Sequence, residues 1–201
     1  MPKPARRRGD AGQAFPIYIT VVAGLLFLAF AYLAVGQGAV SRNGAQTAAD
    51  AAALAAAQDT RDQLADQWLR DIRDPDKWQD VFDGKLDVDP DSCVRADELA
   101  ALNDSHLDEP CQPDGLLAYK VRVMTNKPVG DSIVPGTEGM YAKAEARAVI
   151  EPLCEPPDLT PGSDVLPELA CEGGKTWTPD PDDSASLPKP EDLFDVHLAD
   201  D

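Results

Sequence analysis

The stretch from Ala14 to Gly36 reads AFPIYITVVAGLLFLAFAYLAVG and carries no charged side chain over its 23 residues. As an α-helix it would be roughly 34 Å long, enough to cross a hydrocarbon core of about 30 Å. Signal peptides have shorter apolar regions, although Ala34-Val35-Gly36 and Gly36-Gln37-Gly38 resemble cleavage sites. The stretch therefore predicts a membrane-spanning helix at residues 14–36 that the mature protein keeps, with a cleaved signal peptide as the alternative.

The charges on either side of this helix predict its orientation. The short segment 1–13 contains Asp10 as its one acid and a group of bases, Lys3, Arg6, Arg7 and Arg8. Over the 20 residues that follow the helix, Arg42 is the one base. Because positive loops stay in the cytoplasm, we expect a single-pass protein of the cell membrane with residues 1–13 inside and the C-terminal region outside.

The four cysteines agree with export to an oxidising compartment. They all follow the apolar stretch, at Cys93, Cys111, Cys154 and Cys171. Four cysteines allow three pairings, and the local one joins Cys93 to Cys111 and Cys154 to Cys171. Each bond would then close a loop worth on the order of 3 kcal/mol. We predict the local pairing, with the longer-range links as alternatives; a zinc site is disfavoured because no C-x2–4-C pair occurs.

An alanine-rich run, AQTAADAAALAAAQ, occupies residues 45–58 and predicts that the helix continues as a stalk over 37–74. Asp74-Pro75 should end it, and bends are expected at Gly36, Gly38 and Gly44. One face of the run consists of small residues at spacings of three and four, namely Ala48, Ala49, Ala52, Ala55 and Ala56. Small side chains allow close helix approach, so this face is predicted to contact a partner helix. The alternative is a solvated stalk.

A small exported head is predicted at residues 75–150. Apolar and polar residues alternate over 117–124 and again over 140–150, which predicts two antiparallel strands joined by a long loop at 126–139. A hairpin alone is marginal in water, so it should need the helix, with Trp68, or a third strand. The segment LFDVHL at 193–198 is the late candidate for that strand.

The last segment, 151–201, differs in composition from the rest. It holds nine prolines and 14 acids against two bases, within a chain whose net charge is −18. Such a composition predicts a flexible acidic tail, and the total charge argues against nucleic-acid binding. The fold class expected for the whole chain is α+β: a long transmembrane helix continuing into a stalk, a disulfide-bonded antiparallel head, and the tail.

Two motifs could hold metals, but each lacks a required feature. Asp87, Asp89, Asp91 and Glu98 match the spacing of a calcium loop, yet Ser92 stands where that loop needs glycine. Asp182, Ser184 and Ser186 spell D-x-S-x-S, the adhesion-site pattern of von Willebrand type A domains, but no buried strand precedes them. The sequence contains no G-x-S-x-G, phosphate loop or H-E-x-x-H. We therefore expect no enzyme activity, cofactor, metal or small-molecule substrate.

The N-terminal quarter resembles the TadE/TadG-like proteins of the bacterial tight-adherence, or Flp, pilus system. The resemblance rests on Arg8-Gly9-Asp10-x-Gly12-Gln13 before the apolar stretch and on the alanine run Ala48–Ala55 after it. It implies a membrane-anchored, pilin-like or pilus-assembly component whose partners are the membrane and other pilus or secretion-system proteins. The alternatives are an anchored extracytoplasmic binding module with a disulfide-bonded head and a hydrolase of unrecognised type.

Overall fold

The computed structural model describes residues 14–85, 92–128, 139–156, 166–183 and 186–199. Helices and strands follow one another in the order α1 (Ala14–Arg70), η1 (Pro75–Lys77), α2 (Trp78–Phe82), α3 (Ser92–Leu102), β1 (Ser105–Leu107), β2 (Gln112–Pro113), β3 (Ala118–Thr125), β4 (Lys143–Pro152), β5 (Cys154–Glu155), β6 (Leu169–Cys171), η2 (Glu172–Gly174), β7 (Thr176–Trp177), α4 (Pro190–Leu193) and β8 (Phe194–Leu198). This is the mixed α+β arrangement predicted from the sequence.

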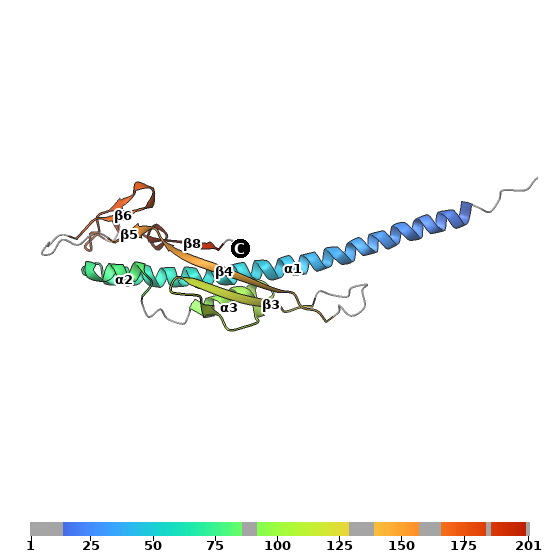
Figure 1. The fold of residues 1–201 in the computed structure, drawn as a ribbon, viewed down its shortest axis with the longest axis horizontal. Coiled ribbons are helices and arrows are strands. Elements are labelled where there is room, and N and C mark those ends of the chain that lie inside the picture. The colour runs from blue at the N-terminus through green and yellow to red at the C-terminus, as the bar shows by residue number, and fades with distance from the viewer. Residues whose placement is uncertain (1–13, 86–91, 129–138, 157–165, 184–185, 200–201) are drawn as a thin grey trace, which may run out of the picture.

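Helix α1 determines the shape of the molecule. Its 57 residues form one continuous helix, which at 1.5 Å per residue is about 85 Å long. Figure 1 shows its N-terminal half projecting away from the other elements and its C-terminal half lying among them. The helix stays unbroken through Gly36, Gly38 and Gly44, where bends were expected, and curves only gently. The chain turns after Arg70, slightly before the predicted stop at Asp74-Pro75.

The main sheet is antiparallel, in the order β1-β3-β4-β8, and β2 also pairs with β3. The predicted hairpin is confirmed as β3 and β4, with Val121 opposite Ala146 and Tyr119 opposite Ala148. The predicted third strand is confirmed as β8, which pairs with β4 so that Val196 lies opposite Ile150. Strands β5, β6 and β7 form a second, small antiparallel sheet.

The alternating pattern of β3 and β4 gives the sheet one buried face. Tyr119, Val121 and Val123 of β3 are buried, as are Ala148 and Ile150 of β4. All five belong to the same hydrophobic cluster as the C-terminal half of α1. The sheet and α3 therefore form a head around this half of α1, and the helix is the centre of the core rather than a separate stalk.

The far end of the core is made of large side chains. Trp68 of α1 lies against Trp78 of α2, with ring centroids 5.3 Å apart. Phe82 is equally close to Phe194 of β8, and Leu193 beside it is fully buried. The prediction that Trp68 supports the hairpin is consistent with this arrangement.

The segment 151–201 differs from the flexible tail that its composition predicts. In its described part, β8 completes the main sheet and Leu193 and Phe194 enter the core. In the described part, no acidic residue of this segment is buried, while Leu169, Leu193 and Phe194 are fully buried. A boundary at residue 150 is also not seen, because β4 continues to Pro152.

Both predicted disulfides are present. Cys93 of α3 is bonded to Cys111, and Cys154 of β5 is bonded to Cys171 of β6. The first bond links α3 to the segment before β2, and the second joins two paired strands of the small sheet. The local pairing is therefore confirmed.

Candidate functional site

The projecting half of α1 exposes a continuous apolar surface. Among the described residues, no position before Ala45 is buried. Phe27 is 72% exposed and Tyr32 is 83% exposed, although both are large side chains. Leucines, valines and isoleucines around them are exposed to similar extents. A water-soluble surface does not carry so large an apolar patch, so this surface requires a partner or a membrane.

Its dimensions fit a bilayer. In the described part of the chain, α1 is the one helix that is long and apolar enough to span a membrane, and its most apolar window is entirely unburied. Tyr18 and Tyr32 lie near the two ends of the predicted span, at the positions where aromatic residues gather at membrane–water interfaces. By composition, length and exposure, α1 is therefore a candidate for a membrane anchor. The bases Lys3, Arg6, Arg7 and Arg8 lie outside the described residues.

The alanine face predicted to contact a partner helix is occupied by the chain itself. Ala48, Ala49, Ala52 and Ala56 are fully buried in the head, and Ala55 is half-buried. The surrounding cluster contains Ala96 and Ala100 of α3 and Ala146 and Ala148 of β4. The physical reason for the alanines is thus intramolecular: small side chains on all three elements let α3 and the sheet lie close to α1. In this structure the face is not available to another helix.

A polar network that the sequence did not reveal lies where α1, α3 and β3 meet. The buried Thr60 hydroxyl donates to the Tyr119 hydroxyl oxygen at 2.8 Å and lies 2.9 Å from Ser92 Oγ. Ser92 in turn donates to Asp59 Oδ2 at 2.9 Å, and Gln63 donates to the same carboxylate at 2.8 Å. Buried polar groups with partners fix the register of the elements that carry them. The network therefore sets how α1, α3 and β3 are aligned.

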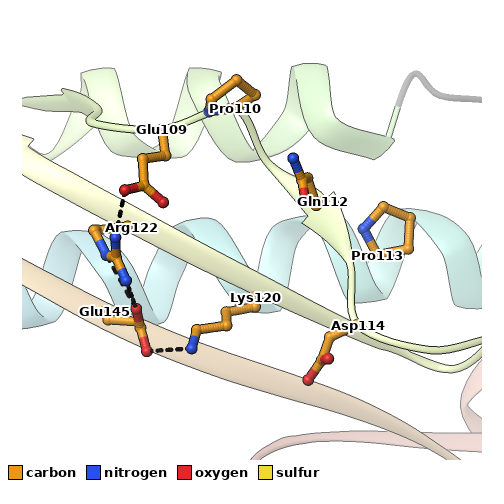
Figure 2. Close-up of a pocket in the computed structure, with 8 residues that line it drawn as sticks. All are labelled: Glu109, Pro110, Gln112, Pro113, Asp114, Lys120, Arg122 and Glu145. Atoms are coloured by element: carbon orange, nitrogen blue, oxygen red, sulfur yellow. Dashed lines mark hydrogen bonds and ion pairs between the residues drawn. The ribbon is translucent and has the colours of Figure 1, made fainter.

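A shallow cavity of about 270 Å³ lies on the solvent side of β3, between β2 and β4 (Figure 2). Its floor is an ion-pair cluster centred on Glu145 of β4. Lys120 Nζ is 2.7 Å from Glu145 Oε1, and Arg122 Nη2 is 2.6 Å from Glu145 Oε2. Arg122 also pairs with Glu109. Lys120 and Arg122 thus pair with Glu145 and Glu109 within the cavity, while Asp114 of its lining pairs with Arg147 outside it.

The cluster shifts the titration of its members. Hydrogen bonds from Lys120 and then Arg122 hold the pKa of the Glu145 carboxyl below its ordinary value. The Glu145 carboxylate likewise raises the pKa of Arg122. The cavity is smaller than the roughly 300–1,000 Å³ of small-molecule sites, and charged or polar residues make up most of its lining. It is best understood as a surface ion-pair network that aligns neighbouring strands.

The metal candidates from the sequence are not assembled in the described residues. Asp87, Asp89 and Asp91 lie outside them, and Glu98 on α3 pairs with Arg95. Ser184 also lies outside them, while Asp182 pairs with Arg73 at 2.9 Å. Within the described ranges no group of three or more metal-ligating side chains occurs.

No curated protein and no solved structure gives a significant match to the chain. A family model matches residues 12–59, which are 48 of the 201 residues. The matched segment begins just before α1, includes its projecting half and ends just after the alanine run. In this segment the chain is similar to the TadE/G-like proteins of Flp pilus assembly.

Proposed function

We propose that the chain is a non-enzymatic, single-pass membrane component of a tight-adherence pilus system. In this role, α1 anchors the protein and the head is presented outside the cytoplasm, in contact with other pilus or secretion-system proteins. The support is the family match over residues 12–59 together with the exposed apolar surface of α1.

The observation that carries the proposal is that the matched segment, from Ala14 on, belongs to one continuous helix with two environments. Its first part exposes apolar side chains suited to lipid, and its second part, from Ala45, is the centre of the head. A helix of this kind joins a membrane anchor to a folded head without a linker. The arrangement suits a structural component whose head must keep a defined position above the membrane.

The disulfides and the basic N-terminal segment support an outside location for the head. Disulfides persist in oxidising compartments, and both bonds lie in the part that follows the span. The bases at Lys3 to Arg8 favour a cytoplasmic N-terminus. A reporter enzyme fused after Asp201 should therefore be active only outside the cytoplasm; activity inside would contradict the orientation.

The role in pilus assembly is tested by complementation. Host cells that lack the chain should lose surface pili, and the full-length chain should restore them. A variant with Leu25→Lys and Leu28→Lys should not restore pili, because a lysine at a helix centre disfavours membrane insertion by about 2.5–3.5 kcal/mol. The matched control, Leu25→Ile and Leu28→Ile, keeps the apolar surface and should restore them. Normal pili in the cells without the chain would refute the role and favour an independent anchored binding module.

A further inference from the structure

We propose that the head itself touches the bilayer, through a membrane-proximal end formed by Leu102, Lys127, Met140 and Tyr141. The occupant of this surface is the lipid headgroup region of the same membrane that α1 crosses. The inference therefore rests on the anchoring role proposed above and adds a second contact with the membrane.

The position of this surface along the axis of α1, here called its level, follows from the way β4 runs along that helix. Figure 1 shows the joined end of β3 and β4 directed toward the projecting half of α1. Gln46 of α1 donates to the carbonyl oxygen of Glu145 at 3.4 Å, which places these two residues side by side. Tyr141 precedes Glu145 by four residues, or roughly 13 Å of extended chain. On α1 that distance corresponds to about nine residues, so Tyr141 lies near the level of Gln37.

Gln37 is the first residue after the predicted span, so this level coincides with the membrane–water interface. The headgroup region extends roughly 5–8 Å beyond the hydrocarbon core. The strand pair keeps its geometry up to this point, because Thr125 N–H donates to the Ala142 carbonyl oxygen at 3.0 Å. Tyr141 and Met140 are therefore held at the depth of the headgroups and not merely somewhere above them.

The side chains at this level are those that suit an interface. Met140 is 57% exposed and Tyr141 is 47% exposed. Both side chains are largely apolar, and the tyrosine side chain ends in a polar hydroxyl. Tyrosine is one of the two residues enriched at membrane surfaces. Leu102, at 79%, is exposed at the C-terminal end of α3. It belongs to the same end of the head, because Ser105 of β1 pairs with Thr125 of β3.

The described charges at this end are balanced between acids and bases, so they do not repel lipid headgroups. Exposed Lys127, just after β3, pairs with Asp104, and exposed Lys143, at the start of β4, pairs with Asp108. Exposed Arg42 lies on α1 just before the head. The strong negative charge of the chain is concentrated elsewhere, in residues 151–201 with 14 acids against two bases. Basic side chains next to the surface can contact lipid phosphates. The acidic part of the head is then directed away from the membrane.

The test is a measurement of depth in lipid vesicles with the full-length chain. Tyr141→Trp places a fluorophore at the proposed contact, and Leu116→Trp is the matched control. Leu116 is also exposed but precedes β3, at the opposite end of the strand. Phosphatidylcholine brominated near the glycerol backbone quenches tryptophans in the interface. Emission from Trp68, Trp78 and Trp177 is common to both variants and is subtracted using the unmodified chain.

We expect a clear loss of emission for Tyr141→Trp and little loss for Leu116→Trp. A third variant, Leu28→Trp, reports whether α1 is inserted, using lipid brominated deep in the acyl chains. Quenching at position 28 with equal, weak quenching at 141 and 116 would overturn the interface contact while leaving the anchor intact. Absence of quenching at position 28 would refute the anchor, and with it the contact.

Discussion

Replacing Ala52 and Ala56 together with leucine should destabilise the head. Both alanines are fully buried on α1, in a cluster that includes Ala96 and Ala100 of α3. Leucine retains high helix propensity, so the change adds volume without weakening the helix itself. The head must then either separate from α1 or force side chains out of their preferred rotamers.

The size of the effect follows from overpacking of a closed core. An inserted side chain of this kind costs about 1–3 kcal/mol at each site. The two positions are one helical turn apart and share neighbours, so the two costs need not add. Their sum, about 2–6 kcal/mol of unfolding free energy, is therefore an upper range for the pair. For a domain of this size each kcal/mol lowers the midpoint of thermal unfolding by roughly 2–4 °C. We therefore expect the midpoint to fall by about 10 °C.

The assay is thermal unfolding of the full-length chain in detergent micelles, followed by near-ultraviolet circular dichroism of the buried tryptophans. Gln58→Leu is the matched control, because it adds leucine to an exposed position of the same helix. If the face were instead a contact for a partner helix, the double variant would melt like the unmodified chain and fail only in association. An unchanged midpoint would therefore refute the intramolecular role of the alanines.

Three further predictions concern stability. Replacing Cys154 and Cys171 with serine should cost about 3 kcal/mol in a denaturant titration, since their bond closes a loop of 17 residues. Thr60→Val should cost about 1–3 kcal/mol because it leaves the buried Tyr119 hydroxyl without its donor, and the double variant with Tyr119→Phe should cost less than the sum of the two single changes. The lowered pKa of Glu145 predicts a stabilising contribution that is present above about pH 4.3 and lost as the pH falls through the folded-state pKa. The difference in unfolding midpoint between the unmodified chain and Glu145→Gln should therefore shrink on acidification; a constant difference would contradict it.

Local patterns in the sequence were sufficient for several elements. The uncharged stretch and the alanine run predicted α1, and two-residue alternation predicted β3, β4 and the side of each that is buried. The even number and spacing of the cysteines predicted the pairing. Each of these signals lies within a few tens of residues of sequence, and each reflects one local requirement, such as burial of one strand face or closure of one disulfide loop.

The use of the alanine face could not be predicted in the same way. A stripe of small residues indicates close approach of another element but does not identify that element. The contacts come from α3 and β4, which follow Ala52 in the chain by about 40 residues or more. The Thr60–Ser92–Tyr119 network was missed for the same reason, because each of its members alone is an unremarkable polar residue.

The described part of the acidic segment shows a second limit of composition. Proline and acid content indicates poor burial on average, yet Leu169, Leu193 and Phe194 are fully buried and join this segment to the core. Pairing with β4 then satisfies the backbone of β8. The apolar residues of LFDVHL, the late candidate for a third strand, pointed to this pairing, whereas the overall composition pointed to a flexible tail.

The position of β8 in the core affects when the head can fold. Phe194 packs near Phe82 and completes a sheet around α1, although it is synthesised long after the alanine run. Under the proposed orientation, Ala52 and Ala56 meet water until α3 and β4 have crossed the membrane, and the core around Phe82 stays open until β8 has followed. Alanine is the side chain for which this delay is least harmful, since it keeps the helix formed and offers little apolar surface for aggregation. Completion of the head thus waits for β8 rather than for the alanine run.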